Sequence, residues 1–324
     1  MYIPKTTSSQ IPAITAPPLQ GRIDSLSFVC SFYATRELSN RLNVHPKLKR
    51  WTSMAKPENF FVVINPTLDR HVALERATEI ANSLPVKPRI VVFIGVDATR
   101  VVDKPSNKNL YRDSGWLDRE ICAPLQGNDI DFDIVFSWCS SWAASVMQVA
   151  ESVGATMILM RAQPTVDSFF QFNFGKWNVF KNSKCPVLLV RGEAMTKTGV
   201  VLAAVKWQTQ NGEQKLLNRK ILDAAKATSS WSGSQLHVVN AFRDAISHPD
   251  RGTLLRNAEV ANCNIHIAQG DPTKVIGSVA LGTEAELVVV GTKGHSYGSD
   301  KIHPAKLERL LSMIEVDVLV VNSK

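Results

Sequence analysis

The sequence contains few cysteines, and they stand far apart. Its 324 residues include Cys30, Cys122, Cys139, Cys185 and Cys263, an odd number without any CxxC pair. This spacing excludes a disulfide framework and a cysteine zinc site, and it favours a reducing, cytoplasmic setting. Cys139 is expected at a strand end, where a lone cysteine is either a redox-sensitive thiol or, more often, small apolar filler.

Long apolar runs and catalytic fingerprints are also absent. No apolar run reaches membrane-spanning length, so we expect no membrane span. Neither of the strands that would open a dinucleotide-binding unit carries GxGxxG, which argues against a flavin or dinucleotide enzyme. No nucleophile, base and orienting acid fall in a recognisable catalytic order, and the histidines lack metal-ligand spacing. We therefore predict a protein that is not an enzyme and binds no metal.

The net charge of +8 is concentrated near the N-terminus. Residues 1–53 hold seven basic residues against two acidic ones, which leaves a nearly neutral remainder. A basic tail on such a body is typical of a solvated extension, so we expect no specific nucleic-acid partner.

Residues 1–57 are predicted to be an N-terminal extension. Ser, Thr and Pro crowd its first twenty positions, a composition that predicts poor order. A transit peptide is one interpretation, since the segment is basic and hydroxyl-rich, although Asp24 and Glu37 weaken it. Another is a mis-assigned start, with the natural product beginning at Met54. Mass spectrometry of the native N-terminus separates these interpretations.

The remainder alternates short apolar runs with amphipathic helical patterns. We expect strands over residues 60–64, 90–96, 131–138, 155–160, 186–191, 200–205, 236–241, 264–268, 287–290 and 318–321. We expect helices over residues 69–84, 109–125, 141–153, 212–227, 252–261 and 273–281, and a last one around 307–314. Apolar runs without alternation are typical of parallel strands buried on both faces. The pattern predicts two tandem doubly wound five-stranded parallel sheets, in domains over 58–193 and 198–324.

The closing segments of the two domains repeat each other. ATMILMRA, a loop and KWNVFKNSKCPVLLV parallel AELVVVGT, a loop and KLERLLSMIEVDVLVV. Both last strands are apolar on both faces, and an uncovered edge of that kind promotes aggregation. We therefore predict that the domains pair through residues 187–190 and 318–321 of one chain, with a homodimer also possible.

These motifs, in this order, resemble the universal stress proteins, and most closely their tandem-domain E type. VVINP at 62–66 resembles the VVIDP of that type, Trp177 precedes a basic helix, and CPVLLVR at 185–191 resembles its CPxPVLLVK. GDPTKVI at 270–276 matches a helix start in its second domain. The resemblance covers roughly residues 58–323 and implies an adenine nucleotide alpha hydrolase-like fold. It implies a non-catalytic stress-response protein that binds a small anionic or apolar ligand, or alternatively an ATP-binding switch.

The nucleotide site of the family is degenerate in the first domain. Nucleotide-binding members carry an Asp at the end of the first strand, then GxxG, nine residues and Gly-Ser or Gly-Thr. Here Asn65 stands at the Asp position, and the fourth strand ends in RAQP, with Gln163 and no glycine. A loop with side chains and a proline offers fewer N–H donors to a phosphate.

The second domain retains more of the motif, and we expect any ligand site there. Lys206 or Trp207 stands at the Asp position, and Pro304-Ala305 replace the Gly-Ser pair. The candidate ligand-binding residues are Lys206, Gly291, Lys293, Gly294, His295 and Ser296. The glycines after the strand either let N–H groups approach an anion or merely shape a tight turn. No cofactor is predicted, and ATP is expected to bind weakly.

Overall fold

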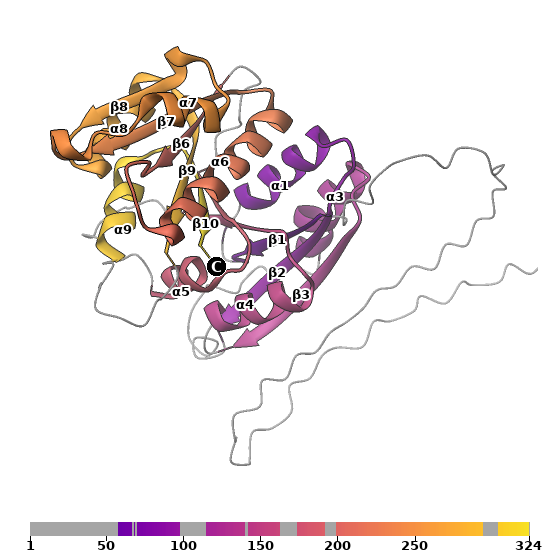
Figure 1. Cartoon of the computed structure of the whole chain (residues 1–324). Coiled ribbons are helices and arrows are strands. Elements are labelled where there is room, and N and C mark those ends of the chain that lie inside the picture. Colours follow the sequence, from indigo (N-terminus) through magenta and orange to yellow (C-terminus); the bar gives the residue numbers. More distant parts are fainter. Residues whose placement is uncertain are drawn as a thin grey trace, which may run out of the picture.

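Two five-stranded parallel sheets join into one ten-stranded sheet. The computed structural model describes residues 58–66, 68, 70–97, 115–139, 142–162, 174–191, 199–293 and 304–323. The strand order there is β3-β2-β1-β4-β5-β10-β9-β6-β7-β8 (Figure 1). All neighbours within β1–β5 and within β6–β10 are parallel, and only β5 and β10 are antiparallel. The predicted fold class is confirmed, while the domain limits remain a prediction and the extension lies outside the described residues.

Each half repeats the same succession of elements. The N-terminal half comprises β1 Asn59–Ile64, α1 Val72–Ser83, β2 Arg89–Asp97, η3 Asp118–Cys122, α3 Ala123–Gly127, β3 Phe132–Cys139, α4 Trp142–Ser152, β4 Met157–Arg161, α5 Phe174–Asn182 and β5 Val187–Val190. The C-terminal half comprises β6 Val200–Val205, α6 Gly212–Ser232, β7 Gln235–Phe242, η4 Ala245–Ser247, α7 Arg251–Ala258, η5 Asn262–Asn264, β8 Ile265–Gln269, α8 Pro272–Gly282, β9 Ala285–Thr292, α9 Pro304–Met313 and β10 Asp317–Asn322.

Several helix ends differ from the sequence-based expectation. The first helix begins at Val72 and not at residue 69. Of the helix expected over 109–125, the described part contains the π-helical turn η3 and the short helix α3. Helix α6 runs five residues beyond the expected end and stops at Gly233, whose φ of 70° is the left-handed conformation that favours glycine. Gly154 takes the same conformation after α4, as predicted.

The ninth strand is longer than the sequence suggested. We expected the run to break at Gly291, but β9 continues through Thr292. Gly291 pairs in register with Val321 and Thr292 with Asn322, so β10 holds both residues in the sheet. Cross-strand pairing here outweighs the low strand propensity of glycine.

One core lies on each face of the sheet. Side chains of α1, η3, α3, α6 and α7 pack with alternate strand residues on one face, and those of α4, α5, α8 and α9 do so on the other. Both cores extend across the two halves, and α1 lies beside α6 over the middle of the sheet (Figure 1). In the described part of the chain, no helix has the length and apolarity needed to cross a membrane.

The last strands of the two halves pair as predicted. Leu319 lies opposite Leu188, flanked by the pairs Val318 with Leu189 and Val320 with Val187. All of β5 and β10 is buried. Each apolar strand therefore covers the edge of the other within one chain.

Candidate functional site

The carboxyl ends of β6 and β9 meet at one edge of the sheet. In open parallel sheets, ligands bind beyond the strand ends where the strand order changes direction, which in this half is between β6 and β9. Exposed Lys206 follows β6, and half-buried Lys293 follows β9. Because these strands are parallel neighbours, the two lysines belong to adjacent strand ends. Gly294, His295 and Ser296 lie outside the described residues.

Two buried asparagines hold the backbone that follows β6. Asn218 of α6 accepts the N–H of Lys206 at 3.1 Å and donates to the carbonyl of Lys206 at 2.7 Å. Asn240 of β7 accepts the N–H of Trp207 at 2.6 Å. Both asparagines are at most 1% exposed. These two backbone N–H groups are thus occupied by the protein's own side chains and are not offered to an anion.

Two glutamines extend this amide cluster. Gln214 donates to the side-chain oxygen of Asn218 at 3.1 Å, and Gln208 donates to the carbonyl of Ala241 at 2.8 Å. The side-chain oxygen of Gln208 is buried and accepts no hydrogen bond from the described residues. Sequence reasoning missed the cluster. The sequence did contain a signal for this cluster, namely Asn240 within an apolar strand and Asn218 on an apolar helix face. A buried amide needs hydrogen-bond partners, so both positions predict a polar cluster.

Gly291 is explained by packing between strand and helix. A Cβ built on it would lie 2.7 Å from a methyl carbon of Ile221 and 2.8 Å from Leu217 Cγ, both in α6. Real Cβ atoms do not approach other atoms so closely, so α6 can rest on β9 only where the strand carries glycine. That Gly291 also contacts a ligand stays a prediction, and such a contact would be made by its backbone.

The helix that follows the candidate site begins on a proline. Helix α9 starts at Pro304, which occupies the Gly-Ser position of the family motif together with Ala305. Helix N-termini bind anions through free N–H groups, and proline has none. Ala305 also lacks the hydroxyl that Ser or Thr would supply. This end of the site therefore offers fewer donors to a phosphate than the motif does.

The equivalent place in the N-terminal half has a different chemistry. Exposed Asn65 follows β1, and its carbonyl accepts the N–H of Leu68 at 3.3 Å. The last residue of β4 is Arg161, and the N–H of the next residue, Ala162, donates to Val190 at 2.8 Å. Gln163 lies outside the described residues. The predicted degeneracy of this half rests on the residue types at these positions.

Two histidines form a pair between β7 and β8. Nδ1 of His237 lies 3.1 Å from Nε2 of His266, and the rings stack at a centroid distance of 5.2 Å. Burial lowers the pKa of both rings, with further lowering of the His237 pKa by His266 and of the His266 pKa by Arg251. The Nδ1–Nε2 contact is short enough for a hydrogen bond between His266 and His237. His237 was missed, because the partner lies on another strand.

The histidine pair predicts lower stability at acidic pH. The folded state holds both pKa values below the unfolded value of about 6.5, so the unfolded chain binds more protons below that pH. Urea midpoints should therefore fall as pH drops from 7.5 to 5.5, and less so in His237→Gln. Exposed His248 in the same half supplies the control, His248→Gln. A pH dependence unchanged in His237→Gln would contradict this role.

Two of the described cysteines, Cys122 and Cys185, have thiols with a raised pKa. Burial raises the pKa of the Cys185 thiol, and burial followed by Asp118 raises that of Cys122, so neither is an activated nucleophile. The side chain of Cys139 is outside the described set. Within the described ranges, no three His, Cys, Asp or Glu side chains are arranged to hold a metal ion.

Comparisons with known proteins identify the relatives of this architecture. Universal stress protein E of Photorhabdus laumondii is 21% identical over 83% of this chain and 96% of its own length, and that of Escherichia coli is 22% identical over 83% and 95%. No family profile matches the chain.

Solved structures agree with the sequence relatives. A putative universal stress protein of Pseudomonas aeruginosa superposes with a TM-score of 0.67, 20% identity, and coverage of 82% of this chain and 94% of the other. One from Archaeoglobus fulgidus gives a TM-score of 0.63, 17% identity, and coverage of 83% and 100%. The chain thus has the fold of the tandem universal stress proteins and is similar in sequence to their E type along both halves.

Proposed function

We propose that this chain is a non-catalytic stress-response protein of the cytoplasm that binds a small anionic or apolar ligand in its C-terminal half. The observation that carries the ligand site is the placement of Lys206 and Lys293 at adjacent strand ends, at the position where open parallel sheets bind ligands. Two lysines there attract negative charge. The similarity to universal stress protein E supports the stress-response role.

The same surroundings disfavour ATP as the ligand. Lys206 stands in place of the acidic residue, the N–H groups after β6 bind Asn218 and Asn240, and α9 begins on Pro304. A ligand smaller than a nucleoside triphosphate needs fewer donors. An ATP-binding switch is the alternative proposal.

We expect magnesium ATP to bind only in the millimolar range. Charge-assisted hydrogen bonds contribute about 1.5–3 kcal/mol each, and two or three are missing relative to the family motif. Since about 1.4 kcal/mol corresponds to tenfold in affinity, a micromolar site becomes millimolar. Isothermal calorimetry with purified protein measures this directly. A micromolar dissociation constant would establish the ATP switch instead.

The ligand itself is sought by native mass spectrometry of the purified protein, and its site by a lysine substitution. Lys293→Gln should weaken the affinity for a co-purifying anion by about tenfold, the loss of one charge-assisted contact. Lys274→Gln, at an exposed position on α8 in the same half, should leave the affinity unchanged. Equal losses in both variants would show a general effect of charge and place the site elsewhere.

A further inference from the structure

The two strands that join the halves are nearly identical in sequence. β5 is Val-Leu-Leu-Val, and residues 318–321 of β10 are Val-Leu-Val-Val. Apolar shape alone would let β5 pair with β10 of its own chain or with β5 of a second copy. The first arrangement is the one observed. Chain connectivity already favours β10 through its high effective concentration, and a structural difference between β10 and β5 adds to that preference.

Hydrogen bonds at the two ends of this junction do not make the choice. Arg191, directly after β5, donates from its guanidinium to the carbonyl of Leu311 in α9. Asn322, the last residue of β10, donates to the carbonyls of Phe180 at 3.1 Å and Lys181 at 2.9 Å in α5. The two contacts are reciprocal, because in each case a polar side chain at the end of the last strand donates to the last helix of the other half. A pairing of two β5 strands would offer Arg191 an equivalent carbonyl.

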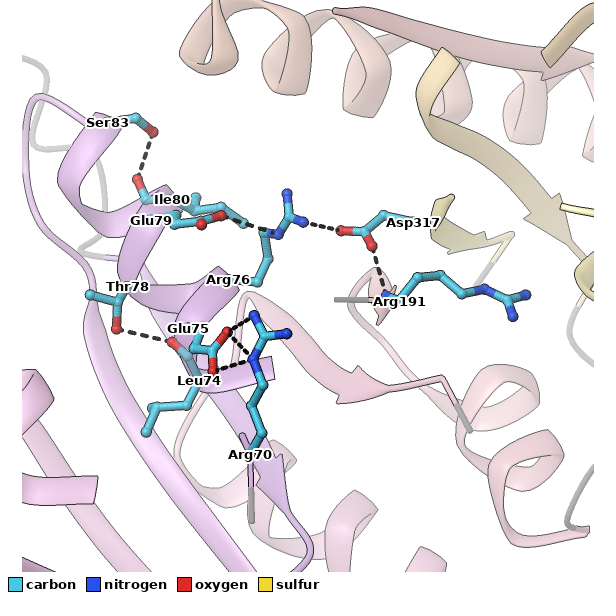
Figure 2. Close-up of polar contacts among 10 residues, drawn as sticks. All are labelled: Arg70, Leu74, Glu75, Arg76, Thr78, Glu79, Ile80, Ser83, Arg191 and Asp317. Atoms are coloured by element: carbon cyan, nitrogen blue, oxygen red, sulfur yellow. Dashed lines mark hydrogen bonds and ion pairs between the residues drawn. The ribbon is translucent and has the colours of Figure 1, made fainter. Parts of the chain in front are cut away.

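Among the described residues, a buried ion pair lies on one side of the junction, between α1 and the start of β10. Oδ2 of Asp317 lies 3.3 Å from a guanidinium nitrogen of Arg76, and both side chains are 3% exposed. Oδ1 of Asp317 accepts the backbone N–H of Arg191 at 2.8 Å. Figure 2 shows the Arg76 guanidinium between Glu79 and Asp317, while the side chain of Arg191 points away from Asp317.

The sequence makes this ion pair asymmetric. Asp317 immediately precedes the Val-Leu-Val-Val run, and the residue in the same position before β5 is Pro186. A β5–β5 pairing would place Pro186 where Asp317 stands, once for each copy. Two Arg76 guanidinium groups would then be buried without the Asp317 carboxylate, although Glu79 stays within 3.4 Å of each. Removing one partner of a buried ion pair is strongly destabilising. A β10–β10 pairing would leave β5 uncovered beside Arg76.

We infer that the Arg76–Asp317 ion pair selects β10 as the partner of β5 and excludes β5 of a second copy of this chain from that edge. Burial of the apolar strands stabilises the junction, and the ion pair determines which strand pairs there. Replacing a buried ion pair by apolar side chains of similar size leaves stability nearly unchanged or higher, so selection can be tested separately from folding.

A cysteine reporter detects the excluded pairing. Leu188 lies opposite Leu319 at the centre of the junction, so in a β5–β5 dimer it would lie opposite Leu188 of the other copy. Directly opposed antiparallel residues are close enough for a disulfide. Leu188→Cys is introduced into the wild-type chain and into three variants. Two are interior variants, Arg76→Met with Asp317→Leu, and Asp317→Asn alone. The third is a surface control, Arg70→Met with Glu75→Leu. Arg70 and Glu75 form an exposed ion pair beside α1 (Figure 2).

Each full-length chain is refolded from urea at high concentration with oxidised glutathione, and disulfide-linked dimer is measured on a non-reducing gel. Chains without Leu188→Cys give the background from the native cysteines. Both interior variants should form about tenfold more linked dimer than the wild type and the surface control, the factor set by about 1.4 kcal/mol of lost selection. Asp317→Asn keeps the shape of the side chain and removes its charge. If the doubly substituted chain does not fold, the amount of linked dimer formed by Asp317→Asn tests the inference. Equal dimer in the interior variants and the wild type, or an equal rise in the surface control, would overturn the inference.

Discussion

A chain carrying Leu189→Lys and Leu319→Lys should fail to form the joined sheet. Both leucines are at most 3% exposed, and they belong to opposite faces, Leu189 to the core of α4 and α5 and Leu319 to that of α1 and α6. Each lysine would bury an unpaired ammonium group, at an effective cost of several kcal/mol. The two costs together approach the free energy of unfolding of a typical domain, which is about 5–15 kcal/mol.

Circular dichroism during thermal unfolding and small-angle scattering follow this outcome. We expect a large drop in melting temperature or an expanded particle in which the halves have separated. Leu216 and Leu281, which are 49% and 82% exposed, supply the matched control, Leu216→Lys with Leu281→Lys. That control should retain the parent's melting temperature and compactness. Parent-like values in the Leu189 and Leu319 variant would contradict the pairing.

Gly291→Ala should destabilise the fold by about 1–3 kcal/mol, the usual cost of extra volume in a packed core. The added methyl group would stand 2.7–2.9 Å from side-chain carbon atoms of Ile221 and Leu217, so these side chains or α6 itself would have to shift. Urea unfolding at neutral pH measures the change. The substitution separates the packing role of Gly291 from a role in ligand approach, because only the packing role lowers stability in the absence of ligand.

Gly282→Ala is the control for this measurement. Gly282 ends α8, and a Cβ built there meets nothing within 4 Å. Alanine at a helical position is favoured over glycine by about 0.5–1 kcal/mol, so this variant should be as stable as the parent or more so. If both glycine variants unfold at the parent's midpoint, then α6 does not need glycine at residue 291.

Local patterns were sufficient to predict the strands and the order of the elements. β6 has the predicted bounds, since a β-branched run between polar neighbours is unambiguous. The end of α6 was not predicted, because its last turns are rich in Ser and Thr. There Thr228 and Ser232 donate back to the carbonyls of Ala224 and Thr228, both at 2.8 Å, and Thr228 is buried. Tertiary burial thus outweighs a low helix propensity.

The polar interior could not be predicted, because its partners are distant in the sequence. Arg76 and Asp317 are each unremarkable in their segments, and only the antiparallel junction brings them together. Asn218 and Asn240 similarly converge from a helix and a strand on the end of β6. The lysines after β6 and β9 were predicted, since parallel strands place their ends at one edge. Sequence periodicity reports which face is buried, not what each buried polar atom binds.

The junction also sets an order of events during synthesis. β5, which ends at Val190, leaves the ribosome well before β10, which begins at Asp317. At a synthesis rate of roughly 5–20 residues per second, the apolar edge of β5 stays uncovered for on the order of ten seconds before β10 is made. On a polysome, neighbouring nascent chains present the same edge to one another throughout that interval. Arg76 has already been made by then, so the rejection of a second β5 acts before β10 has been made.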